Sequence, residues 1–269
     1  MTTFNGSKLV AIQTTSTLPA ILSTPQFNPN GVAQYVLQNV AYFHSRGRVV
    51  GPDAFLPENI ILLESSTGPE PVLLLKDGVS TNEEDIRAAG ALLSYIWTFG
   101  SRVPDIMKQG VITRMTARDG ALPTIGSVLK DPAFWSSSRV MDFLMSVSDV
   151  LELKQRLHIS AIEKEGATVY NRSWLYSLAL VLQEKVERDS RRRRQYSGTC
   201  VRDLLRVVRN LAHHYYELAP EVRAALGSRE GLGDFWVSTF PHLLRHTYAA
   251  MEPFMGATNC ARIAGFYTV

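Results

Sequence analysis

The chain has 269 residues, of which 45% are hydrophobic, and a formal net charge of +3 at pH 7. This length suits a globular protein with one or two hydrophobic cores, and the mild positive charge is compatible with RNA without identifying it as a partner. Two cysteines argue against a disulfide scaffold and favour a reducing, cytoplasmic compartment. No stretch reaches roughly 18 apolar residues, so we expect no membrane segment.

The first predicted helix covers residues 32–45, between Gly31 and Gly47. Its predicted apolar face consists of Val32, Tyr35, Val36, Val40 and Phe43. Two short apolar runs follow at residues 60–63 and 72–75, separated by a turn-rich segment, and these predict a β-hairpin.

A capping box of the type S-x-x-E, formed by Ser80 and Glu83, predicts the start of a helix that runs to about Phe99. Helices then dominate to the C-terminus. The apolar spacing there predicts core positions at Trp135, Phe143, Leu144, Trp174, Leu178 and Leu182.

One later helix carries most of the chemistry. Its predicted core face consists of Val201, Leu204, Leu205, Val208 and Leu211. The remaining surface is left to Arg202, Arg206, Arg209, Asn210, His213 and His214. Asn210 and His214 are four residues apart and so share one face, with Arg206 one turn earlier.

These residue types suit RNA cleavage without a metal ion. Such a reaction uses the 2′-hydroxyl as nucleophile and needs a base, an acid and donors to the phosphorane oxygens. Histidine titrates near neutrality and serves proton transfer, while arginine stays charged and matches phosphate oxygens. The alternative is that the two histidines only interact favourably with the helix dipole.

A run of arginines, which includes Arg193 and Arg194, stands just before Tyr196. Such runs are commonly solvated loops, and beside a nuclease site this one is a candidate for steering phosphates. We see no cluster of Cys and His with zinc-ligand spacing, so we expect no metal ligands.

The motifs around this helix resemble the kinase-extension nuclease (KEN) family, which includes the kinase-endoribonuclease sensor of the unfolded protein response and ribonuclease L. The resemblance rests on Tyr196, the run 201–206, the segment 209–215 and the downstream segments 217–227 and 240–252. It covers about half the chain and implies an all-helical nuclease domain.

The resemblance also implies roles for individual residues. His214 corresponds to the general acid and Tyr196 to the proposed base, while Arg209 and Asn210 hold the scissile phosphate. Asp149 corresponds to an acidic residue that supports the site, and Tyr248 to a tyrosine near the bound base. From their place on the helix, Arg206 and His213 are further supporting or RNA-binding candidates. The sensor has two lysines where this chain has Leu211 and Ala212, which puts sensor-style RNA selection in doubt.

The first half resembles the C-terminal lobe of a protein kinase whose catalytic parts are lost. Asn59 survives from the catalytic loop, and Asp53 survives only if one residue is inserted. The metal-binding D-F-G appears as residues 76–78 without its Phe, and residues 1–30 contain no glycine-rich loop. We therefore expect no cofactor, and neither ATP nor magnesium binding.

These inferences give a mainly α fold: a truncated pseudokinase C-lobe over residues 1–136, helical with one small β-hairpin, fused to an all-helical nuclease over 137–269. The expected function is endoribonuclease cleavage to 2′,3′-cyclic phosphate and 5′-hydroxyl ends, by a homodimer in a stress response. The alternative is an inactive scaffold that pairs with a full-length sensor. A protein kinase is a third reading, which the lost catalytic parts disfavour.

Overall fold

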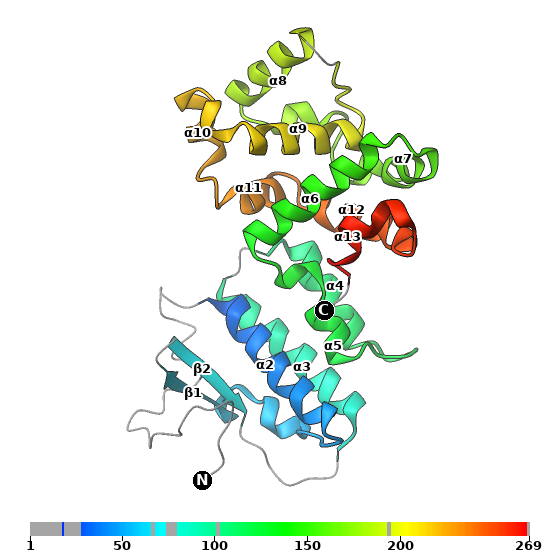
Figure 1. Cartoon of the computed structure of the whole chain (residues 1–269). Coiled ribbons are helices and arrows are strands. Elements are labelled where there is room, and N and C mark those ends of the chain that lie inside the picture. The colour runs from blue at the N-terminus through cyan, green and yellow to red at the C-terminus, as the bar shows by residue number, and fades with distance from the viewer. Residues whose placement is uncertain are drawn as a thin grey trace. The chain divides into compact units, whose positions relative to one another are not determined.

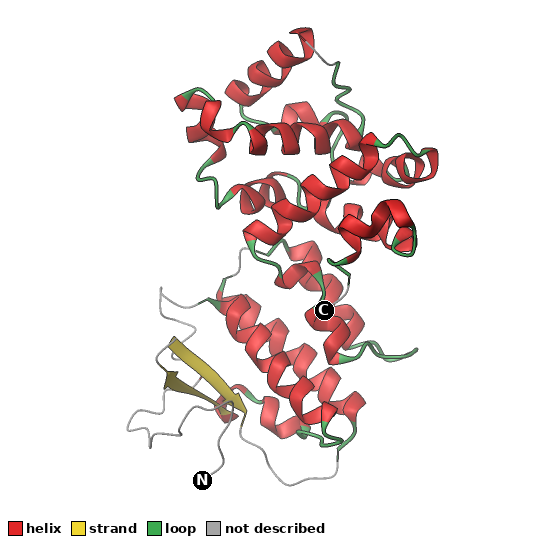
Figure 2. Cartoon of the chain, in the orientation of Figure 1, coloured by secondary structure: helices red, strands yellow, loops and turns green. Residues whose placement is uncertain are grey.

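The computed structural model describes residues 18, 28–65, 68–73, 80–100, 103–192 and 195–267. The chain divides into two compact units, one made of Met1–Ser101 with Lys108–Leu129 and the other of Arg102–Met107 with Lys130–Val269. The predicted boundary at 136/137 falls inside the second unit. The fold is mainly α as predicted, and the strands among the described residues form one hairpin in the first unit (Figure 2).

The first unit combines helices with this hairpin (Figure 1). Its elements are α2 (Pro29–Ser45), η1 (Pro52–Phe55), η2 (Pro57–Asn59), β1 (Ile60–Ser65), β2 (Gly68–Leu73), α3 (Asn82–Ile96), η3 (Trp97–Phe99), the larger part of α4 (Asp105–Met115) and α5 (Ile125–Leu129). Helix α2 packs against α3, α5 and β2.

The start of α2 differs from the prediction. Asn28 is the N-cap, and its side chain accepts a hydrogen bond from the Asn30 N–H at 3.1 Å. Gly31 therefore lies inside the helix, whereas Gly47 follows it with a φ of +67° as its predicted role requires. Tyr35, predicted to face the core, is 37% exposed; it lies at the edge of the apolar stripe, where the helical spacing no longer points inward.

The hairpin is confirmed, with Ile60 opposite Leu73 in an antiparallel register. The second strand begins at Gly68, earlier than predicted, and residues 74–79 lie outside the described residues. The capping box of the next helix lies one residue later than predicted: Thr81 accepts from the Glu84 N–H, and Glu84 accepts from the Thr81 N–H. The α-helical part ends at Ile96, and η3 completes the predicted span.

A buried carboxylate organises the first unit. Asp85 is fully buried at the start of α3 and accepts hydrogen bonds from the Val50 N–H at 2.7 Å and the Gly51 N–H at 2.8 Å. The Ser80 hydroxyl, at 3.1 Å, and the His44 ring, at 2.9 Å, complete its partners. Because four donors surround it, this carboxylate ties the turn before η1 to α3.

All regular elements among the described residues of the second unit are helices. Its elements are η4 (Pro132–Phe134), α6 (Ser137–Glu152), α7 (Arg156–Glu163), η5 (Gly166–Thr168), η6 (Trp174–Ser177), α8 (Leu180–Arg192), α9 (Val201–His213), η7 (Tyr215–Glu217), α10 (Pro220–Leu226), α11 (Leu232–Thr239), α12 (Leu243–Met251), η8 (Glu252–Phe254), η9 (Thr258–Cys260) and α13 (Ala261–Ala264). None of the helices in the described ranges combines the length and apolarity needed to cross a membrane.

Helix α6 is the centre of this unit, with α9 and α11 packed against it (Figure 1). At the contact with α11, a Cβ on Gly233 would lie 2.1 Å from the Ser137 carbonyl oxygen, so only glycine permits this approach. The Asp234 N–H donates to the Ser137 hydroxyl at the same place. Of the predicted core, Trp135 is half-buried, and the fully packed members are Phe143, Leu144, Trp174, Leu178 and Leu182.

Candidate functional site

Helix α9 presents the predicted apolar face to the core. Its buried members include Val201, Leu204, Leu205, Val208 and Leu211. One prediction is wrong: Arg209, assigned to the surface, is only 8% exposed. The reason is an ion pair with a carboxylate on α6, which lets the guanidinium lie between the two helices.

A glutamate from another helix caps the N-terminus of α9. Glu163, the last residue of α7, accepts hydrogen bonds from the N–H groups of Val201 at 3.0 Å and Arg202 at 2.9 Å. These are backbone donors that the helix itself leaves unpaired. The Cys200 thiol donates to the same carboxylate, and burial together with this contact raises the pKa of Cys200 to about 12. Cys200 is therefore no candidate nucleophile.

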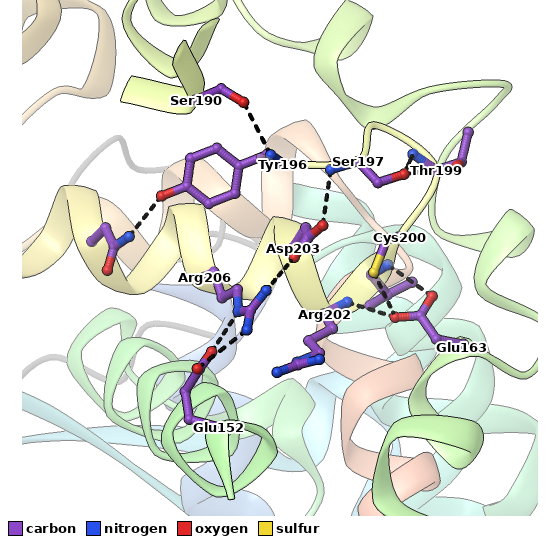
Figure 3. A network of polar contacts seen from close by, with 12 residues as sticks. Glu152, Glu163, Ser190, Tyr196, Ser197, Thr199, Cys200, Arg202, Asp203 and Arg206 are labelled. Atoms are coloured by element: carbon purple, nitrogen blue, oxygen red, sulfur yellow. Dashed lines mark hydrogen bonds and ion pairs between the residues drawn. The ribbon is translucent and has the colours of Figure 1, made fainter. Parts of the chain in front are cut away.

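The loop that carries Tyr196 is fastened to the elements on both sides of it (Figure 3). The Tyr196 N–H donates to the Ser190 hydroxyl at 3.0 Å, which ties the loop to α8. The Ser197 N–H donates to the Asp203 carboxylate at 2.8 Å, which ties it to α9. Both backbone groups next to the tyrosine ring are thus satisfied by side chains of neighbouring helices.

Trp174 fastens the other end of this loop. Its indole N–H donates to the carbonyl oxygens of Ser197, at 3.0 Å, and Cys200, at 3.1 Å. The Trp174 N–H bonds the Gly198 carbonyl at 2.9 Å, and a Cβ on Gly198 would lie 2.2 Å from the Ser173 hydroxyl. The tryptophan predicted as core is thus also the polar anchor of the loop.

Arg206 is held between two carboxylates. It donates to both carboxylate oxygens of Glu152 on α6 and to Asp203 at 2.8 Å (Figure 3). The hydrogen bond from Arg206 lowers the pKa of Glu152, and Glu152 in turn raises the pKa of Arg206. This charge is committed to carboxylates, so the contacts favour a scaffold role over the predicted contact with a phosphodiester.

Tyr196 and Asn210, which the sequence places 14 residues apart, meet directly. The Asn210 side-chain amide donates to the Tyr196 hydroxyl oxygen at 2.8 Å. Since the amide is the donor, the phenol proton of Tyr196 is left to point to another partner. The ring reaches from its loop towards α9, as Figure 3 shows.

Arg209 is paired with Asp149, as expected if Asp149 supports the site. The Arg209 guanidinium donates to one carboxylate oxygen at 3.0 Å, and Arg262 of α13 donates to the other oxygen, also at 3.0 Å. Two guanidinium groups therefore share this one carboxylate. Arg262 was not among the residues predicted for the site.

His214 ends α9. It is the C-cap, its N–H donates to the Asn210 carbonyl at 3.1 Å, and its side chain is 61% exposed. Its Nδ1 lies 2.9 Å from the Glu217 carboxylate. His213 is also exposed and lies about 100° round the helix from His214.

The remaining predicted residues stand apart from this arrangement. Tyr248 stacks on Tyr267 with ring centres 4.2 Å apart and packs edge-on against Trp135. Its role near a bound base stays a prediction. Arg193 and Arg194 lie outside the described residues.

The structure thus brings Tyr196 onto Asn210 and Asp149 onto Arg209, with His214 one turn beyond. Within the described ranges, no group of three or more His, Cys, Asp or Glu side chains is arranged to hold a metal ion. Sequence reasoning assigned no role to Glu152, Glu163, Asp203, Glu217 or Arg262. The Asp203–Arg206 and His214–Glu217 pairs carried a local signal, since residues at i and i+3 are neighbours in a helical turn.

Residues 140–262 match the family Ribonuclease 2-5A. Curated relatives include a human serine/threonine-protein kinase/endoribonuclease IRE2, which is 35% identical over 219 residues, covering 70% of this chain and 23% of the relative. The sensor for unfolded proteins in the ER ire1 of Schizosaccharomyces pombe is 35% identical over 47% of this chain and 12% of its own length. The kinase/endoribonuclease IRE1b of Arabidopsis thaliana is 34% identical over 48% of this chain and 15% of its own length.

The chain spans less than a quarter of the length of each of these relatives. The alignment with the human relative covers 70% of the chain, which is more than residues 140–269 contain, so it also includes part of the first half. The matched segment holds Tyr196, Arg209, Asn210, His214 and Asp149. Through residues 140–262, this chain belongs to the Ribonuclease 2-5A (KEN) family.

Proposed function

We propose that the chain is an endoribonuclease that cleaves RNA without a metal ion, through attack by the 2′-hydroxyl. The observation that carries this proposal is the direct bond between Tyr196 and Asn210, with His214 on the next turn of α9. These three residues, together with Arg209 next to Asn210, suit proton transfer and phosphate binding near the C-terminal end of one helix. Relatives whose names include endoribonuclease support the same activity.

In the proposed reaction, Tyr196 passes its phenol proton to solvent and takes the proton of the 2′-hydroxyl while the 2′-oxygen attacks phosphorus. A new P–O2′ bond forms and the P–O5′ bond breaks. His214 gives a proton to the departing 5′-oxygen, so the products are a 2′,3′-cyclic phosphate and a 5′-hydroxyl. Asn210 and Arg209 stabilise the charge on the non-bridging oxygens.

The burial of Arg209 sharpens its proposed role. Asp149 and the α6–α9 interface hold its guanidinium in one place, so a phosphate oxygen would meet a donor that is already positioned. The second guanidinium, Arg262, is 67% exposed on the other side of Asp149 and adds positive charge. These charges suit a polyanionic substrate.

For the first unit, we propose a degenerate kinase C-lobe that acts as a scaffold. Asp85 at the start of α3 holds the turn before η1, and the Asn59 side chain donates to the Asp53 backbone carbonyl at 2.7 Å. Through this contact, the Asn59 side chain stabilises the backbone of its own loop. The alignment with the human kinase/endoribonuclease, which extends into this half, supports the kinase-like origin.

We also propose that the active species is a homodimer and that it acts in mRNA processing or decay during an unfolded-protein response. One relative's name describes a sensor for unfolded proteins in the ER. Cys200 and Cys260 are free thiols, which fits a cytoplasmic setting. Intramolecular bonds already hold the Tyr196 loop, so pairing would act on RNA binding rather than on the order of residues 195–200.

The test is cleavage of a mixed RNA pool by the purified chain in EDTA, with the ends of the fragments mapped. Cyclic phosphate and 5′-hydroxyl ends, lost in His214→Ala, are the expected result. Cleavage that requires added metal would refute the proposed chemistry. A chain that folds, leaves all RNA intact and binds a full-length kinase-endoribonuclease would instead favour the scaffold alternative.

A further inference from the structure

The histidine at the end of α9 has a carboxylate partner that the proposed reaction has not used. His214 Nδ1 lies 2.9 Å from Glu217 Oε2. His214 is the N-cap of the 3₁₀ turn η7, and the Glu217 N–H donates to the His214 carbonyl at 2.9 Å. Side chains three apart eclipse one another in a 3₁₀ turn, so the backbone itself brings the imidazole and the carboxylate together.

The turn that presents this pair is anchored to the core. Tyr215 is buried, and its hydroxyl donates to the Gly227 carbonyl at 2.6 Å, which ties η7 to the end of α10. Leu218, directly after the turn, is also buried. Glu217 is therefore an exposed carboxylate on a fixed backbone, and its place relative to His214 is set by buried neighbours on either side.

We propose that Glu217 is a positioning residue for His214, an inference that rests on the proposed endoribonuclease function. A carboxylate can only accept, so the pair keeps a proton on Nδ1. The ring nitrogen that faces away, Nε2, is then the one that delivers a proton to the 5′-oxygen as the P–O5′ bond breaks and the P–O2′ bond forms. His214 keeps its Nδ1 proton throughout, and after the transfer its Nε2 carries a lone pair.

The alternative is that His214 and Glu217 form a surface ion pair with no role in catalysis. The two side chains are 61% and 75% exposed, and exposed pairs contribute little to stability. This exposure makes the two readings separable. Loss of Glu217 should leave the unfolding curve unchanged under either reading, whereas only a positioning role predicts a slower proton transfer to the leaving oxygen.

The test compares Glu217→Ala with Glu221→Ala, a control that removes an exposed carboxylate one turn later on α10. On ordinary RNA, Glu217→Ala should cleave about tenfold more slowly, a fraction of what a complete general acid contributes, and the control should match the unaltered chain. Glu217→Gln, whose amide oxygen can still accept from Nδ1–H, should recover part of the rate.

A substrate with a 5′-bridging sulfur at the cut site identifies the step. A thiolate departs without being protonated, so Glu217→Ala should lose its defect on this substrate. An equal defect on both substrates, or no defect on either, would overturn the proposal.

If the unaltered chain cleaves neither substrate, the proposed function fails, and the nitrogen NMR signals of His214 still decide the pairing. A protonated Nδ1 at neutral pH that becomes a mixture of tautomers in Glu217→Ala supports the pairing. Unchanged ring signals would refute it.

Discussion

Replacement of Asp203 by alanine should weaken both the second unit and its candidate site. Asp203 is 7% exposed and joins two groups: the Ser197 N–H, beside Tyr196, and the Arg206 guanidinium, each at 2.8 Å. A hydrogen bond to a charged group contributes about 1.5–3 kcal/mol. Arg206 keeps Glu152 as a partner, which partly offsets the loss of its bond to Asp203. We therefore expect the free energy of unfolding to fall by about 2–4 kcal/mol in total.

The effect on cleavage has a separate cause. Without Asp203, the backbone next to Tyr196 loses its tie to α9, and a shift of about 1 Å in a reacting group can cost about 100-fold in rate. Urea unfolding followed by tryptophan fluorescence measures the stability. Single-turnover cleavage, at a temperature where the variant is folded, measures the rate.

Amide hydrogen exchange locates the change. The peptide that contains residues 195–200 should exchange faster in Asp203→Ala and should be unchanged in Asp142→Ala, which removes an exposed aspartate from α6. The control should alter stability by less than about 0.5 kcal/mol. Unchanged exchange at residues 195–200, together with normal cleavage, would refute the anchoring role of Asp203.

Three further predictions concern the same unit. His214→Ala should slow cleavage by about 100- to 10,000-fold with the circular dichroism spectrum unchanged, and His213→Ala should be much milder; the reverse order would reject the assignment of the acid. Arg206 lowers the pKa of Glu152, so the folded carboxylate contributes stability above its unfolded pKa and loses it as pH falls through the folded pKa. Glu152→Gln should therefore unfold at a lower urea concentration than the unaltered chain at neutral pH, and the difference between their urea midpoints should vanish in acid. A difference that does not depend on pH would contradict this. Specific activity should rise with protein concentration and level off as sedimentation shows a dimer; constant activity from nanomolar to micromolar protein would rule out a requirement for pairing.

Local patterns in the sequence predicted the helices well. The spacing of apolar residues on α9 identified its buried face because that face is set by the helical period alone. The capping box was displaced by one residue because the sequence offers both Ser80–Glu83 and Thr81–Glu84. The structure uses the second, and the Ser80 hydroxyl bonds Asp85 instead.

Such local patterns could not predict contacts between segments that are far apart in the sequence. Arg209 is buried because Asp149, 60 residues earlier, neutralises it across the α6–α9 interface. The N-terminus of α9 is capped by Glu163 rather than by its own N-cap residue. Each depends on which helices become neighbours, and that information is not local. The residues of the candidate site were identified by family resemblance, whereas the side chains that hold them required the structure.

The most direct test of the central claim is a pair of oligonucleotides that differ in one atom. The first carries RNA throughout a cut site mapped in EDTA, and the second has a single 2′-deoxy nucleotide on the 5′ side of that bond. If the 2′-hydroxyl is the nucleophile, the first is cleaved to a cyclic phosphate and the second stays intact at that bond while it still competes for binding. Cleavage of the deoxy bond at a comparable rate would contradict the account.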